Sequence, residues 1–215
     1  MTGIELCRAI KADFSICHIP VVLLTAQTAT EQALEGLRTG ADDYITKPFN
    51  TDILVSRCNN LVNTRRMLQR KFSEHPHTQA DLLATNPLDK QLVDKAMRVI
   101  DDHITDSDFN VDVFAQEVGL SRTSLFTKWK SLTGQTPKSF LLNMRLRKAA
   151  AMLHSEQGKS VEAVALDCGF STGRYFCKCF KEYYKVSPSA YRKGHQPEAG
   201  NSPSPEATGS RENHS

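Results

Sequence analysis

Residues 1–72 alternate between helical and strand-like patterns of apolar side chains. The short apolar run at 20–25 is typical of a parallel strand that is buried on both faces, and residues 43–46 are predicted to form another short strand. Apolar residues three and four apart predict three helices, around Ile4–Ile10, around Ala33–Leu37 with closure at Gly40, and from Asn50 to about residue 68. The order helix, strand, helix, strand, helix predicts a partial α/β segment.

The rest of the chain separates into three further parts. Residues 73–87 break every hydrophobic period and predict a linker. Residues 88–194 follow a helical pattern throughout, whereas 195–215 combine Pro, Gly, Ser, Asn and Glu, and we expect them to be disordered. The predicted fold class is mostly α, with an all-α domain after the partial α/β segment.

An internal repeat is the strongest signal in the sequence. Residues 111–121 align with 161–171 at an offset of 50, and Leu125–Phe140 aligns with Phe176–Tyr191 at an offset of 51 because the second copy has one extra residue. Each copy reads as a short helix, then Gly, an apolar residue and Ser, then a second helix.

The turn in each copy has the chemistry of a helix-turn-helix. Gly119 and Gly169 are placed to end the first helix in the left-handed conformation, and Ser121 and Ser171 are placed to cap the second helix. Such a turn sets the second helix across the first, where it can enter a major groove.

The second helix of each copy has one apolar stripe and one polar face. We expect a buried stripe of Leu125, Trp129 and Leu132 in the first copy and of Phe176, Phe180 and Tyr183 in the second. The opposite faces then predict base contacts from Thr123, Phe126, Thr127, Arg174 and Lys178. Phosphate contacts are predicted from Ser121, Lys130, Ser171 and Lys181. Solvated helix faces with ordinary serine caps are the alternative interpretation.

A single long helix is predicted between the copies, from Pro137 to His154. We expect it to hold the two second helices about 34 Å apart, so that one chain reads two successive major grooves.

Charge agrees with this interpretation. The net charge of the chain is only +3, but residues 119–194 contain 14 Lys and Arg against 4 acidic residues, whereas 88–118 contain 3 against 8. A compact basic region attracts phosphate backbones.

The sequence shows no motif of a metal site or an enzyme. The six cysteines have no metal-ligand spacing and are expected to be free thiols, and no metal or cofactor is expected. No nucleophile motif or phosphate-binding loop indicates an enzyme.

Residues 88–193 resemble the DNA-binding domain of the AraC/XylS-type regulators. The resemblance rests on the segments Gly119–Pro137 and Gly169–Tyr191. It implies a seven-helix module, a role in transcription regulation and the base contacts named above, with double-stranded DNA as partner. RNA polymerase and a second copy of the chain are further candidate partners. Gly173 departs from the family, which often carries proline at this helix start.

Residues 1–72 resemble the carboxy-terminal part of a flavodoxin-like response-regulator receiver domain. The resemblance matches Thr25 to the phosphoryl-sensing hydroxyl residue, Tyr44 to the aromatic switch, and Lys47-Pro48 to the lysine and cis-proline pair. The phosphoacceptor aspartate is absent from the matched part, so we expect Thr25 and Lys47 to be vestigial.

A receiver segment followed by an AraC-type domain implies the output half of a hybrid two-component phosphorelay regulator. The chain is then expected to be a carboxy-terminal fragment of such a regulator, or the product of a gene model that starts at an internal methionine. The lack of a signal sequence and of a long apolar run predicts a cytoplasmic chain without a membrane segment. A signalling adaptor that acts only through protein contacts of the receiver remnant is the alternative function.

Overall fold

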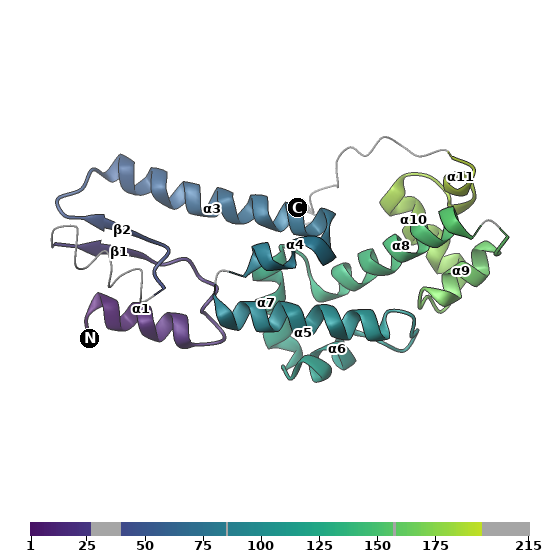
Figure 1. The fold of residues 1–215 in the computed structure, drawn as a ribbon, viewed down its shortest axis with the longest axis horizontal. Coiled ribbons are helices and arrows are strands. Elements are labelled where there is room, and N and C mark those ends of the chain that lie inside the picture. The colour runs from purple at the N-terminus through teal and green to yellow at the C-terminus, as the bar shows by residue number, and fades with distance from the viewer. Residues whose placement is uncertain (27–39, 85, 157, 195–215) are drawn as a thin grey trace, which may run out of the picture. The chain divides into compact units, whose positions relative to one another are not determined.

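The computed structural model describes residues 1–26, 40–84, 86–156 and 158–194 (Figure 1). The chain forms two compact units. The first comprises Met1–Ile104 with Asp108–Asn143, and the second comprises Thr105–Ser107 with the residues from Met144 onward. Within the described ranges no helix is long and apolar enough to cross a membrane.

Two of the three helices and both strands predicted for the amino-terminal segment are present in the described residues. Helix α1 (Gly3–Ala12) precedes strand β1 (Val22–Thr25), and strand β2 (Asp43–Thr46) precedes helix α3 (Thr51–Glu74). The strands pair in parallel, with Val22 opposite Asp43, which confirms the predicted pairing. Helices α1 and α3 lie on opposite faces of this two-stranded sheet (Figure 1). The helix expected around Ala33–Leu37 lies outside the described residues.

Residues 73–87 do not form the irregular linker that the sequence pattern predicted. Helix α3 continues to Glu74, helix α4 (Pro76–Leu83) follows after one residue, and helix α5 (Pro87–His103) begins soon afterwards. Phe72 and Leu83 are fully buried. Burial of these two side chains compensates for the polar composition around them, since helical stability in proteins comes mostly from tertiary packing. The expectation of irregular structure was therefore wrong.

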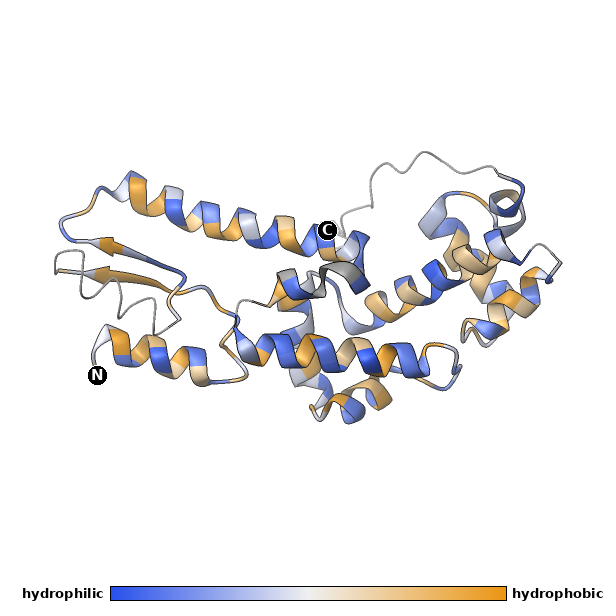
Figure 2. Cartoon of the chain, viewed as in Figure 1, coloured by the Kyte–Doolittle hydropathy of each residue, from blue (hydrophilic) through white to orange (hydrophobic). Residues whose placement is uncertain are grey.

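The remaining described residues form helices joined by short turns, in agreement with the predicted all-α domain. They form α5, α6 (Val111–Val118), α7 (Arg122–Thr133), α8 (Pro137–Ser155), α9 (Val161–Asp167), α10 (Gly173–Tyr184) and α11 (Pro188–Arg192). Figure 2 shows hydrophobic and hydrophilic residues alternating along α3 and α5, as expected for helices with one buried face. The fold class, mostly α with a small sheet, is confirmed. The tail 195–215 lies outside the described residues.

Aromatic rings pack against one another in the core of each unit. In the first unit, Trp129 makes edge contacts with Phe114 and Phe140 at centroid distances of 5.8 and 5.0 Å. In the second unit, Phe176 packs edge-on against Phe170 and Phe180 at 5.0 and 5.3 Å. Contacts of this kind contribute about 0.5–1.5 kcal/mol beyond the area they bury.

Candidate nucleic-acid interface

The first helix-turn-helix consists of α6, α7 and the turn between them. Gly119 ends α6 with a φ of 81°, in the left-handed region, and its N–H donates to the carbonyl of Gln116 at 3.0 Å. Ser121 then caps α7, because its hydroxyl accepts from the Ser124 N–H at 3.1 Å. Both features were predicted from the Gly-Leu-Ser sequence.

The second helix-turn-helix, α9 and α10, closes differently. Gly169 has a φ of 75°, but the residue that caps α10 is Thr172, whose hydroxyl accepts from the Tyr175 N–H at 3.3 Å. The prediction that Ser171 caps this helix was wrong. The extra residue in the second copy moves the helix start by one position, and Ser171 is left exposed in the turn.

Helix α7 has the two faces that the sequence predicted. Leu125, Trp129 and Leu132 are fully buried. The residues proposed to meet DNA from this helix, Thr123, Phe126, Thr127 and Lys130, are all exposed. Phe126 is 44% exposed, and the Lys130 ammonium lies 5.8 Å from the centroid of its ring. A large apolar ring and a cation therefore stand together on the outward face.

Helix α10 repeats this arrangement within the second unit. Phe176 and Phe180 are fully buried, whereas Arg174, Lys178 and Lys181 are exposed. Tyr183, which we expected in the buried stripe, is only half-buried. Its hydroxyl lies 3.3 Å from both Nε and Nη2 of Arg147, which donate to it, so this tyrosine lies at the polar boundary of the core.

Two residues that contribute to these faces were missed by the sequence analysis. Tyr175 occupies the first turn of α10 and is 47% exposed, with its ring 6.2 Å from that of Phe170. Arg122 begins α7 and donates twice to the Asp112 carboxylate at 2.8 Å, which ties the start of α7 to α6. The repeat itself held a signal for Tyr175, because this residue aligns with the exposed Ser124 at the offset of 51.

Of the residues matched to a receiver domain, Thr25 and the Lys47-Pro48 pair lie at the carboxyl ends of the two strands, and Tyr44 lies within β2. Thr25 pairs with Thr46 in the parallel register, and the Lys47 N–H donates to the Thr25 carbonyl at 2.6 Å. The Lys47-Pro48 peptide bond is cis, as the resemblance implied, and Tyr44 is exposed. In the part of the chain that the structure describes, no group of three His, Cys, Asp or Glu side chains could hold a metal ion.

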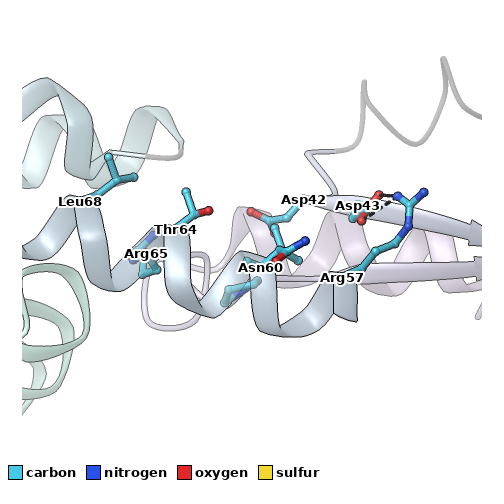
Figure 3. A pocket seen from close by; sticks show the side chains of 9 residues that line it. Asp42, Asp43, Arg57, Asn60, Thr64, Arg65 and Leu68 are labelled. Atoms are coloured by element: carbon cyan, nitrogen blue, oxygen red, sulfur yellow. Dashed lines mark hydrogen bonds and ion pairs between the residues drawn. The ribbon is translucent and has the colours of Figure 1, made fainter. Parts of the chain in front are cut away.

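A pocket of about 440 Å³ lies beside α3 and the start of β2 (Figure 3). Asp42 and Asp43 line it together with Arg57 and Arg65. Arg57 donates to both oxygens of Asp43 at 2.9 and 3.0 Å, and Asp42 lies 2.6 Å from the Lys11 ammonium. Each carboxylate is thus neutralised by a cation, and the pocket has the chemistry of a structural ion-pair cluster.

Both halves of the chain match known protein families. Residues 1–59 match the response regulator receiver domain family, and residues 114–194 match a helix-turn-helix domain family. Histidine kinase P4 of Formosa agariphila is 38% identical over 192 residues, covering 89% of this chain and 14% of that protein. The HTH-type transcriptional regulator MtrA of Neisseria gonorrhoeae is 37% identical over 105 residues, covering 49% of this chain and 34% of the regulator.

Among solved structures, the C-terminal domain of the two-component response regulator yesN from Fusobacterium nucleatum is 32% identical with a TM-score of 0.43. The alignment covers 45% of this chain and 93% of that domain. By contrast, the matched part of this chain spans well under half the length of the two curated relatives, Histidine kinase P4 and MtrA. The chain joins part of a response regulator receiver domain to a helix-turn-helix domain of the AraC-type transcription regulators.

Proposed function

We propose that the chain is a sequence-specific transcription regulator that binds double-stranded DNA through α7 and α10. One observation carries the proposal. Each helix follows a helix-turn-helix turn, buries its apolar stripe and presents a largely polar or basic face to solvent. A helix held in this way can lay its outward side chains on the base edges of a major groove.

The proposed roles follow from the chemistry of the exposed side chains. Arg174 and Lys178 can donate to guanine O6 and N7, while Thr123 and Thr127 can hydrogen-bond to bases or contact a thymine methyl group, as Phe126 can. Ser121, Lys130, Ser171 and Lys181 are proposed to contact phosphates. Ser171 acts there through its hydroxyl alone, because Thr172 holds the cap position.

The regulatory context is part of the same proposal. The receiver segment makes the chain the output half of a two-component phosphorelay, with Thr25, Tyr44, Lys47 and Pro48 as remnants of the receiver site. RNA polymerase and a second copy of the chain are further proposed partners. One chain is proposed to read two successive major grooves, which places α7 and α10 about 34 Å apart when bound.

The salt dependence of binding tests the proposal. Affinity for a fluorescein-labelled mixed-sequence duplex is measured by anisotropy between about 50 and 200 mM salt. Contact with about six phosphates predicts a slope of about −5 for log affinity against log salt concentration. Lys181→Gln should reduce the magnitude of the slope by about one. Lys90→Gln, which removes one positive charge from α5, should leave it unchanged. A chain that acts only as a protein adaptor would show no such binding.

A further inference from the structure

Lys128 lies on the recognition helix α7 but faces away from its DNA-binding side. The residue is 2% exposed, whereas its neighbour Thr127 is on the exposed face. A buried lysine is costly unless it is paired, because the ammonium loses its hydration. Its partners therefore indicate what this position is built to contact.

The partners of Lys128 come from two other parts of the first unit. Its ammonium lies 2.8 Å from the Asp89 carboxylate in the first turn of α5. It also donates to the Phe14 carbonyl at 2.5 Å, contacts the Cys17 Sγ at 2.9 Å and lies 4.9 Å from the centroid of the Phe14 ring. Phe14 and Cys17 belong to the receiver segment, in the turn that follows α1.

The same turn is held by the amino-terminal end of α5. Asn86, the cap of α5, donates from Nδ2 to the Asp89 carboxylate at 2.7 Å and to the Cys17 carbonyl at 3.3 Å. Asp89 is itself fully buried. The turn of the receiver segment is thus enclosed between the back of α7 and the start of α5.

A second lysine joins this turn to the sheet. The Lys11 ammonium donates to the Ile19 carbonyl at 2.9 Å and to the Asp42 carboxylate at 2.6 Å. The Val21 N–H, just before β1, donates to the same carboxylate at 2.7 Å. Polar contacts therefore run without a break from the strands of the receiver segment, through the turn at residues 13–19, to Lys128 on α7.

We propose that Lys128 is a positioning residue for DNA recognition, which transmits the conformation of the turn at residues 13–19 to the outward face of α7. The inference rests on the proposed function. A buried ion pair is weak evidence for stability, since an apolar pair of similar volume is often as stable, but it fixes one arrangement of its partners. Here the ion pair joins α7, the helix that is proposed to read DNA, to the start of α5, and the same ammonium also contacts the turn at residues 13–19.

The test uses the full chain and a duplex selected from a random pool for binding to the wild-type chain, with a scrambled duplex for comparison. Lys128→Met/Asp89→Asn removes both buried charges together, so that neither is left unpaired, and circular dichroism checks its fold. We expect about tenfold weaker binding to the selected duplex and a change below about twofold for the scrambled duplex. Arg57→Met, which breaks an exposed ion pair in the receiver segment, is the matched control and should bind like the wild-type chain.

Hydrogen exchange on the wild-type chain gives a readout that needs no variant. Coupling is reciprocal, so the selected duplex should slow amide exchange at residues 13–19 by about fivefold or more. Unchanged exchange there, or a folded double variant that binds the selected duplex as well as the wild-type chain does, would overturn the role of Lys128 while leaving the proposed function intact. A wild-type chain that binds no duplex would overturn both.

Discussion

The ring of Phe72 stacks on the ring of Phe140, with centroids 5.4 Å apart and planes inclined by only 7°. Phe72 comes from α3, the helix that follows the last strand of the receiver segment, and Phe140 comes from the first turns of α8. Phe72 also makes an edge contact with Trp129 of α7 at 6.5 Å. The receiver segment therefore contributes a side chain to the core of the first helix-turn-helix.

Removing this ring should destabilise the first unit. We expect Phe72→Ala to lower the free energy of unfolding by about 3–5 kcal/mol, because a fully buried aromatic side chain is lost and a cavity remains. Denaturant unfolding monitored by Trp129 fluorescence measures it. Met67→Ala, on the exposed side of the same helix, should change the value by no more than about 0.5 kcal/mol. Equal effects of the two changes would contradict the described packing.

The turn of the first helix-turn-helix depends on the backbone of Gly119. Gly119→Ala should cost about 1–2 kcal/mol of stability, because a residue with a Cβ resists the left-handed conformation. Crowding adds little, since the nearest atom to the new Cβ is the Lys95 ammonium nitrogen at 3.8 Å. Gly158→Ala is a suitable control, because its Cβ would meet nothing within 4 Å and its φ is not positive. Thermal unfolding of both variants decides the point.

Two basic residues of α10 should affect DNA binding in different ways. Arg174→Ala should cost about 1–3 kcal/mol on the preferred sequence and relax the preference at one base pair, whereas Lys181→Ala should weaken binding to all sequences about equally. Affinities for a set of singly substituted duplexes distinguish the two patterns. Equal losses on specific and random DNA from both changes would refute the assignment of base and phosphate contacts.

His18 should make the chain less stable in mild acid. Burial lowers the pKa of His18, and the positive charges of Lys128, Arg65 and Lys11 act in the same direction, while Asp89 opposes them. The unfolded chain then binds the proton more readily, so the free energy of unfolding falls as the pH drops below about 6.5. His18→Gln should lose less stability than the wild-type chain between about pH 7.5 and pH 5.5 in urea titrations. The same loss in both would exclude His18 as the cause.

The cysteines should differ sharply in reactivity. All six are free thiols, but burial raises the pKa of the Cys168 thiol to about 11, whereas Cys58 is exposed on α3. Near pH 8 only about one Cys168 in a thousand is a thiolate, the form that reacts. Brief treatment of the folded chain with iodoacetamide, followed by peptide mass spectrometry, should find label on Cys58 and none on Cys168. Urea should abolish the difference.

Local chemistry made the helix-turn-helix units predictable from the sequence. A glycine after a short helix, followed by an apolar residue and a serine, predicts both the left-handed turn and the next cap, and Gly119 and Ser121 behave in this way. Helical spacing likewise identified Leu125 and Trp129 as core residues and left Phe126 outside. These predictions depend only on residues within one or two turns of each other.

The features that were missed depend on contacts between distant residues. Lys128 has an ordinary position on a basic helix, and only Asp89 and Phe14, far away in the sequence, bury it. The helical structure between residues 73 and 83 depends in the same way on burial of Phe72 and Leu83. The cap of α10 has a local cause: the second copy has one extra residue before its second helix, so that Thr172 and not Ser171 takes the position equivalent to Ser121.

Helix α3 begins at Thr51, shortly after β2, and runs without interruption past Phe72 to Glu74. Inserting one residue into an α-helix turns everything after it by about 100° and advances it by about 1.5 Å. A single-residue insertion between Asn50 and Phe72 would thus turn the Phe72 ring away from its stacked position on Phe140. The number of residues between the sheet and Phe72 therefore fixes the direction in which this side chain points. Chains of this architecture should tolerate insertions or deletions in α3 only when the change in length is close to a whole number of helical turns.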